Sequence, residues 1–382
     1  MNCSRIRIAG IAATLMLAST AGAQSMKVGA VMGLSGPTST VIVPHKMVWE
    51  MVEKNFGGVP YTLTLHDDQA NTNEAVKIAR RLVTEDKVDV LINASTLPTC
   101  LAIVDVAAES QTPLMCMAAP ISLPKPRGDW LFILPPRTTE LVRPAIDQMA
   151  KLGVKSIAYI GFSDSLGDVH YKALEELAAK ANIKVVANER FERTATSVLA
   201  QVLKMTAADP DAVYIGASGT PAALPHSTLT DRGYKKPVFH TNAMVIPQFA
   251  QVGGKNVEGA YAVASPMFVA EQLPESNPVK KQALEFLKSW EGAYGKERRN
   301  PFAGYGYDSF LLIAGAAPRA IKKAQPGTVQ FRQALRDAME DTKDLIGSSG
   351  VYTLTATDHN GTDQRAVVLI RLENGSWKYV ER

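Results

Sequence analysis

Short apolar strand patterns alternate with amphipathic helix patterns along most of this 382-residue sequence. A strand pattern at 26–34 precedes a helix pattern at 43–56, and a second strand pattern at 61–67 precedes a helix pattern at 72–85. Strands that are joined through helices in this way form right-handed βαβ units. The alternation therefore predicts parallel sheets that are covered by helices.

The alternation occurs in two series, which meet at the pair Pro135-Pro136. The first series ends with a strand pattern at 130–134, and the second runs from a strand pattern at 156–161 to another near 264. The chain is longer than one ordinary hydrophobic core accommodates. We therefore predict an α/β protein with two doubly wound parallel-sheet lobes.

The N-terminus has the features of a secretory signal. Arg5 and Arg7 are followed by an apolar stretch at 8–18 and by the small residues Ala21-Gly22-Ala23. This order predicts a signal peptide at 1–23 that is cleaved after Ala23, and hence an exported, periplasmic protein. A membrane anchor is the alternative, but the apolar stretch is too short to cross a bilayer. We expect no direct insertion into the membrane.

Two cysteines remain after that cleavage, because Cys3 lies within the signal peptide. Cys100 and Cys116 could form a disulfide in an oxidising compartment, but their spacing carries no geometric information. Free cysteines are often buried as small apolar residues. We therefore expect two buried free thiols and keep the disulfide as the alternative.

Charge and motifs argue against several classes of protein. The net charge is only +4, and no basic cluster with interleaved aromatic residues indicates nucleic-acid binding. The six histidines are scattered without a metal-ligand spacing, so we expect neither metal nor cofactor. The stretch GASGT at 216–220 nearly matches the nucleophile elbow of hydrolases, with Ser218 as the nucleophile, but Thr220 replaces the final glycine. A binding protein without catalysis is favoured, and an exported α/β hydrolase is the alternative.

The segment DVLINASTLPTC, residues 89–100, predicts a buried strand, a sharp turn and a helix that Pro98 opens. Ala94, Ser95 and Thr96 leave this turn with little side-chain bulk. A tight turn is one explanation. The other is an anionic ligand group bound by the unpaired N–H groups at the start of the helix.

The mature chain resembles the type I periplasmic binding proteins of the leucine/isoleucine/valine-binding class. The matching segments are KVGAVMGLSGP at 27–37 and the ranges 55–83, 88–120, 305–316 and 357–377. The resemblance implies a monomer whose lobes close on a small ligand, and delivery of that ligand to the permease and ATPase subunits of an ABC importer. A ligand-sensing receptor domain of the same fold is a further alternative.

The resemblance also implies how the chain divides. Three crossovers are expected to join the lobes, near 135–140, 264–268 and 347–352. The first lobe is then expected at 24–137 plus 267–348, and the second at 138–266 plus 349–382.

Ligand contacts are implied in both lobes. The expected residues are Ser35, Val41, Thr96, Leu97, Ala118, Ala119 and Ser122 in the first lobe, and Phe162, Asp164, Ser218 and Asn242 in the second. Asn242 stands where amino-acid-binding members carry an acidic residue for the ammonium group. A buried ammonium without a carboxylate partner is costly, so this difference favours an aromatic or other organic acid that lacks an ammonium group. Asp164 could supply the missing carboxylate, and a branched-chain amino acid therefore stays open.

Overall fold

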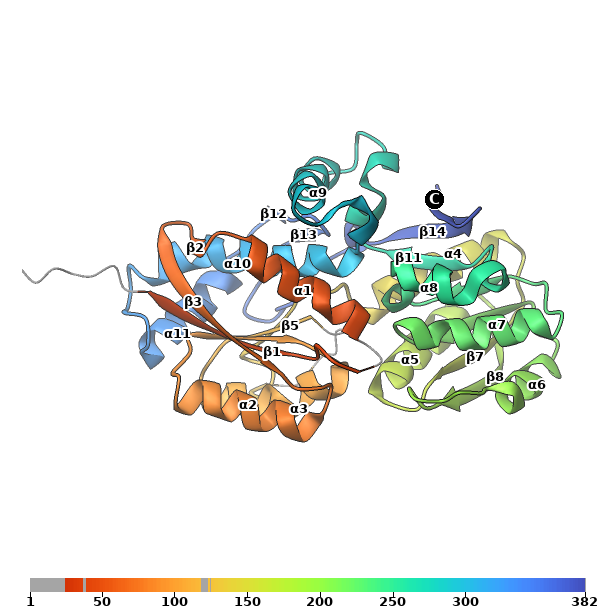
Figure 1. Ribbon diagram of the computed structural model, residues 1–382, viewed down its shortest axis with the longest axis horizontal. Coiled ribbons are helices and arrows are strands. Elements are labelled where there is room, and N and C mark those ends of the chain that lie inside the picture. Colours follow the sequence, from red (N-terminus) through yellow and green to blue (C-terminus); the bar gives the residue numbers. More distant parts are fainter. Residues whose placement is uncertain (1–24, 37–38, 118–122, 124, 382) are drawn as a thin grey trace, which may run out of the picture.

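A computed structural model describes residues 25–36, 39–117, 123 and 125–381, which form two α/β lobes side by side (Figure 1). The first lobe is built on one six-stranded sheet. Its strands are β1 (Met26–Met32), β2 (Asn55–Phe56), β3 (Val59–Asp67), β4 (Val90–Ala94), β5 (Leu114–Cys116) and β6 (Leu131–Ile133). They lie in the order β2-β3-β1-β4-β5-β6, and every pairing is parallel except that of the short edge strand β2 with β3.

The second lobe is built on a seven-stranded sheet. Its strands are β7 (Ser156–Phe162), β8 (Lys184–Phe191), β9 (Ala212–Gly216), β10 (Val238–His240), β11 (Tyr261–Ala264), β14 (Val368–Glu373) and β15 (Ser376–Tyr379). They lie in the order β15-β14-β11-β10-β9-β7-β8. The five strands β7 to β11 pair in parallel, whereas β14 and β15 add to the edge in antiparallel fashion. The predicted α/β class with two parallel-sheet lobes is confirmed.

Helices cover both sheets. The first sheet carries α1 (Ser39–Met51), α2 (Thr72–Thr84) and α3 (Leu97–Glu109), and the second carries α4 (Thr138–Lys151), α5 (Ser165–Lys180), α6 (Leu199–Thr206), α7 (Ala223–Asp231) and α8 (Pro247–Gly253). After β11 the chain forms α9 (Lys280–Tyr294), α10 (Pro301–Ala320), α11 (Val329–Glu340) and the hairpin β12 (Leu345–Ile346) and β13 (Val351–Tyr352). Short 3₁₀ turns occur at η1 (Thr220–Ala222), η2 (Asn242–Met244), η3 (Gly254–Val257), η4 (Pro266–Gln272), η5 (Lys296–Arg298) and η6 (Gln364–Ala366).

The sequence pattern at 306–322 predicts a helix that starts at Gly306, but α10 begins five residues earlier, at Pro301. Asn300 caps it by accepting a hydrogen bond from the Phe302 N–H, and Pro301 occupies its first position. Gly306 allows close packing, since an added Cβ would lie 3.3 Å from the His45 Cα in α1. The earlier start brings Phe302 to the space between the lobes.

The chain passes between the lobes three times. We place the first passage between β6 and α4 and the second after β11. Two observations place the third passage. Asn360 donates hydrogen bonds to the carbonyls of Ile133, at the end of β6, and Pro135, in the first crossover. Val368 already pairs with Ala264 in the second sheet. We therefore place the third crossover at 361–367, later than the expected 347–352, and propose that the lobe boundary moves with it.

Candidate ligand-binding site

A small cavity lies where the carboxyl ends of strands from both sheets meet. The volume open to the centre of a water molecule is about 60 Å³. The lining residues come from both lobes and are Val41, Ile42, His45, Ser95, Thr96, Leu97, Met117, Pro135, Leu166, His170, Arg193, Ser218, Asn242, Ala243 and Phe302. Ligands of open α/β sheets bind at such strand ends. A larger hollow of about 690 Å³ beside α5 contains none of the expected site residues that the structure describes.

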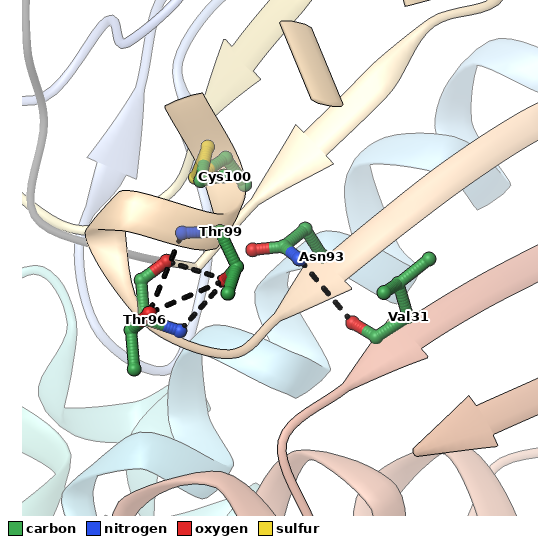
Figure 2. Close-up of a disulfide and its surroundings, with 6 residues drawn as sticks. Val31, Asn93, Thr96, Thr99 and Cys100 are labelled. Atoms are coloured by element: carbon green, nitrogen blue, oxygen red, sulfur yellow. Dashed lines mark hydrogen bonds between the residues drawn. A yellow bond between two sulfur atoms is a disulfide. The ribbon is translucent and has the colours of Figure 1, made fainter. Parts of the chain in front are cut away.

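Thr96 and Thr99 shape the turn between β4 and α3, as Figure 2 shows. The Thr96 N–H donates to the Thr99 hydroxyl (3.0 Å), and that hydroxyl donates to the Thr96 carbonyl (2.8 Å). The Thr96 hydroxyl itself makes only long contacts of 3.4 Å, to the N–H and the hydroxyl of Thr99. Its hydrogen can therefore turn to a better acceptor in the cavity. The N–H of Leu97 lies in the first turn, where a helix offers no internal acceptor.

Five of the expected residues meet at this cavity: Val41, Thr96, Leu97, Ser218 and Asn242. Ala118, Ala119 and Ser122 lie outside the described residues. Three others do not line the cavity. Ser35 is exposed and hydrogen-bonds Asp67. Phe162 and Asp164 contact Arg193, whose side chain lines the cavity in their place.

Arg193 is the functional candidate that sequence reasoning missed. Its Nε lies 2.6 Å from Asp164 Oδ2, and its Nη1 donates to the Ser218 hydroxyl at 3.1 Å. The guanidinium carbon lies 4.4 Å from the centre of the Phe162 ring. Asp164 Oδ1 meanwhile accepts the N–H of Leu166 as the cap of α5. Asp164 is therefore occupied twice, and it holds Arg193 at the cavity wall instead of facing a ligand.

The cavity wall carries one permanent charge among the described residues. Arg193 is the only lysine, arginine, aspartate or glutamate in the lining. Burial lowers the pKa of His45 to about 3 and that of His170 to about 4, so both imidazoles are neutral at pH 7. The segment 118–122 reads AAPIS and contains no ionisable side chain. The wall thus presents a cation and no carboxylate.

Asn242 connects the lobes. It follows β10 at the start of η2, and its side chain hydrogen-bonds the hydroxyl of Tyr305 in α10. Burial raises the pKa of Tyr305 well above its ordinary range, so its hydroxyl stays neutral. The neutral amide of Asn242 therefore spans the cleft and offers no charge to a ligand.

The geometry around Ser218 does not complete a nucleophile elbow. The hydrogen-bond partner of its hydroxyl within the described chain is Arg193, and a guanidinium group only donates hydrogen bonds and does not serve as a general base. The described residues also contain no group of histidine, cysteine, aspartate or glutamate side chains arranged to hold a metal ion. None of the helices in that part of the chain combines the length and the hydropathy needed to cross a membrane.

Cys100 and Cys116 form a disulfide, so the expectation of two free thiols was wrong. Cys100 lies in the first turn of α3 and Cys116 ends β5. Their Cα atoms are 6.3 Å apart, within the range that a disulfide bridges. The pairing depends on how α3 packs against the sheet, which the spacing of 16 residues does not reveal.

Comparisons with known proteins agree with this architecture. The family model for periplasmic binding proteins matches residues 25–376. An extracellular ligand-binding receptor from Rhodopseudomonas palustris is 37% identical, with a TM-score of 0.90 over 94% of this chain and 99% of that one. None of the curated protein sequences gave a match.

Two more distant structures share the fold. One is LivJ from Streptococcus pneumoniae, a branched-chain amino acid transporter substrate-binding protein in complex with isoleucine. It is 22% identical with a TM-score of 0.78, over 94% of this chain and 99% of that one. An ABC transporter solute-binding protein from Rhodopseudomonas palustris BisB5, in complex with 3,4-dihydroxybenzoic acid, is 18% identical with a TM-score of 0.79, over 94% and 96%. The family consists of solute-binding proteins rather than enzymes, and membership implies a place outside the cytoplasm. From its strand order, its cleft between two lobes and a family match over nearly its whole length, this chain is a type I periplasmic binding protein related to the leucine/isoleucine/valine-binding class.

Proposed function

We propose that this protein captures a small organic acid, aromatic or aliphatic and without an ammonium group, and delivers it to the permease and ATPase of an ABC importer. One observation carries the choice of ligand: Arg193 is the sole charged side chain lining the described cavity. Arginine is well suited to bind a carboxylate through paired hydrogen bonds.

The other polar groups fit the same ligand. The Thr96 hydroxyl and the Leu97 N–H at the start of α3 favour a negative charge from the first lobe. Ser218, held by Arg193, offers a further hydroxyl from the second lobe. A carboxylate between Thr96 and Arg193 would connect the two lobes and stabilise a closed form.

An α-amino acid fits the wall less well. Its ammonium group would need a carboxylate, and Asp164 is already occupied by Arg193 and by the start of α5. Structures of this fold bind isoleucine in one case and 3,4-dihydroxybenzoic acid in another, so the fold permits either class. The charge of the cavity wall, and not the fold, supports the acid.

A thermal-shift screen with matched ligands tests the proposal. Leucine and 4-methylpentanoate differ by the ammonium group alone, and benzoate and cinnamate sample aromatic acids. We expect at least one acid to raise the melting temperature and leucine to raise it less than its deaminated analogue. A larger shift with leucine, isoleucine or valine would instead identify a branched-chain amino acid-binding protein.

Calorimetry on variants tests the role of Arg193. A hydrogen bond to a charged group is worth roughly 1.5–3 kcal/mol, so Arg193→Gln should weaken acid binding by about tenfold to a hundredfold or more. Arg190→Gln is the matched control. Arg190 lies near the end of β8, three residues before Arg193, and its guanidinium packs on the Tyr159 ring and does not line the cavity. Adding Asp164→Asn to Arg193→Gln should restore part of the loss, since it removes the carboxylate that Arg193 had neutralised. Equal affinities of wild type and Arg193→Gln would refute the assignment.

We also propose that the chain is exported with cleavage after Ala23. Intact-mass measurement on protein recovered from the periplasm should then give a chain that begins at Gln24. A mass that includes residues 1–23 would contradict the processing step alone.

A further inference from the structure

The Cys100–Cys116 disulfide joins two segments that border the cavity. Cys100 follows Thr99, the residue that shapes the turn around Thr96. Cys116 precedes Met117, whose side chain lines the cavity. Both cysteines are about 1% exposed, so the bond lies in the core directly beneath the site. Figure 2 shows it beside the Thr96–Thr99 turn.

The end of β5 is well anchored in the first sheet. Cys116 pairs in parallel with Asn93 of β4 on one side and with Ile133 of β6 on the other. The Met117 N–H donates to the Asn93 carbonyl at 2.9 Å. The Cys116 end of the disulfide is therefore held by strands on both sides.

The start of α3 is held to the first lobe by a hydrogen bond one residue before its cap: the Ser95 hydroxyl donates to Asp68 Oδ1 (2.9 Å), just after β3. The hydrogen bonds of Thr96 and Thr99 run within the turn, so they fix its shape but not its position. Asn93 lies beneath the turn, but its Nδ2 makes one long contact of 3.5 Å to the Val31 carbonyl and its Oδ1 has no partner. Apolar packing of Leu97 is nondirectional and permits small shifts.

We propose that the Cys100–Cys116 disulfide positions the carboxylate-binding end of α3 and thereby sets the affinity of the site. This inference rests on the proposed function, because it takes the start of α3 as a ligand contact. A carboxylate must meet Thr96 in one lobe and Arg193 in the other at the same time. A shift of the helix start by less than an ångström takes a good hydrogen bond beyond its effective distance. The dithiol form of the protein should therefore bind more weakly while it stays folded.

The test compares two variants of similar stability. Cys100→Ala/Cys116→Ala removes the bond. Ile103→Ala is the control, because Ile103 is fully buried in the same core cluster one turn farther along α3 and does not line the cavity. Hydrogen exchange is followed at the amides of Leu97, Thr99 and Met117 without ligand. Calorimetry then measures binding of benzoate, cinnamate and 4-methylpentanoate at a temperature where far-UV circular dichroism shows all proteins folded.

In the double variant we expect exchange at Leu97 and Thr99 to accelerate by about tenfold, and the bound acid to lose about tenfold in affinity. Ile103→Ala should change neither quantity by more than about threefold at these positions. If the two variants behave alike, the disulfide only stabilises the lobe and the inference is overturned. If the wild type binds none of the three acids, the proposed ligand class is wrong, and the exchange rates alone then show whether the disulfide holds the helix start. Unchanged exchange at Leu97 and Thr99 in the double variant overturns the inference in either case.

Discussion

Mild acid should destabilise this protein through buried neutral histidines. Burial lowers the pKa of His45 to about 3 and those of His170 and His226 to about 4, and it places the pKa of His240 well below its ordinary value. His226 and His240 face each other, with Nδ1 and Nε2 2.9 Å apart. One nitrogen must donate and the other accept, so protonating both rings would break this pair.

The sign follows from proton uptake. A histidine with a lowered pKa binds fewer protons in the folded than in the unfolded protein, so the free energy of unfolding falls as the pH drops below about 6.5. Between pH 7.5 and pH 5.5 each such histidine should reduce that free energy by roughly 1.3 kcal/mol, and four should reduce it by roughly 5 kcal/mol. This is a large share of the roughly 5–15 kcal/mol that stabilises a typical domain.

Buried carboxyl groups act in the opposite sense. Burial raises the pKa of Asp308 to about 6, so the folded protein gains a proton there as the pH falls, and this should offset roughly 0.8 kcal/mol. Burial also raises the pKa values of Asp68 and Asp89, which offsets a further part. A net loss of stability should remain, because the histidines titrate over the whole interval.

Urea unfolding, followed by tryptophan fluorescence at pH 7.5, 6.5 and 5.5 and constant ionic strength, measures this loss. His170→Gln should reduce the difference between pH 7.5 and pH 5.5 by roughly 1.3 kcal/mol, whatever it does to stability at pH 7.5. Leu174→Val, one turn along the same helix, should lower stability by a similar amount at every pH. If His170→Gln kept the full wild-type pH dependence, His170 would titrate alike in both states and the reasoning would be refuted.

Four further outcomes are expected. Asp308→Ala should lower the free energy of unfolding by about 3–5 kcal/mol in urea titrations, because it removes the buried acceptor of four hydrogen bonds from the segment after β12. A loss below about 1 kcal/mol would show that this segment rearranges freely. Gly216→Ala should destabilise the second lobe by about 1–3 kcal/mol, since the added Cβ would lie 1.8 Å from the Tyr159 hydroxyl oxygen. Adding Tyr159→Phe should recover part of the lost stability, and no recovery would argue against that clash. Thr99→Val should lower the free energy of unfolding by about 1 kcal/mol through loss of the capping hydroxyl, and an unchanged melting curve would contradict that role. Asn242→Asp should weaken binding of a simple acid in calorimetry, whereas a neutral or stronger effect would indicate an α-amino acid.

The sequence by itself determined the elements whose signals are local. The helix predicted at 72–85 is found at Thr72–Thr84, because Asn71 accepts hydrogen bonds from the first amides and an apolar stripe faces the sheet. The segment KVVANERF predicts a strand at 184–191, and β8 has those bounds. The turn after β4 was expected from its own residues, and Thr96 indeed caps the helix that follows. Neighbouring residues suffice for such features, since capping and periodicity act within a few residues.

Tertiary structure decided the features that join distant segments. Cys100 and Cys116 pair only because α3 packs over the end of β5, and α10 packs closely against α1 at Gly306, where a Cβ would lie 3.3 Å from the His45 Cα. The order β9-β7-β8 brings three strand ends together, so that Asp164 after β7 and Ser218 after β9 both contact Arg193 after β8. No local pattern distinguishes Arg193 from the other arginines of the chain. Its place at the cavity follows from which strands are neighbours, and strand order is a property of the whole sheet rather than of any one segment.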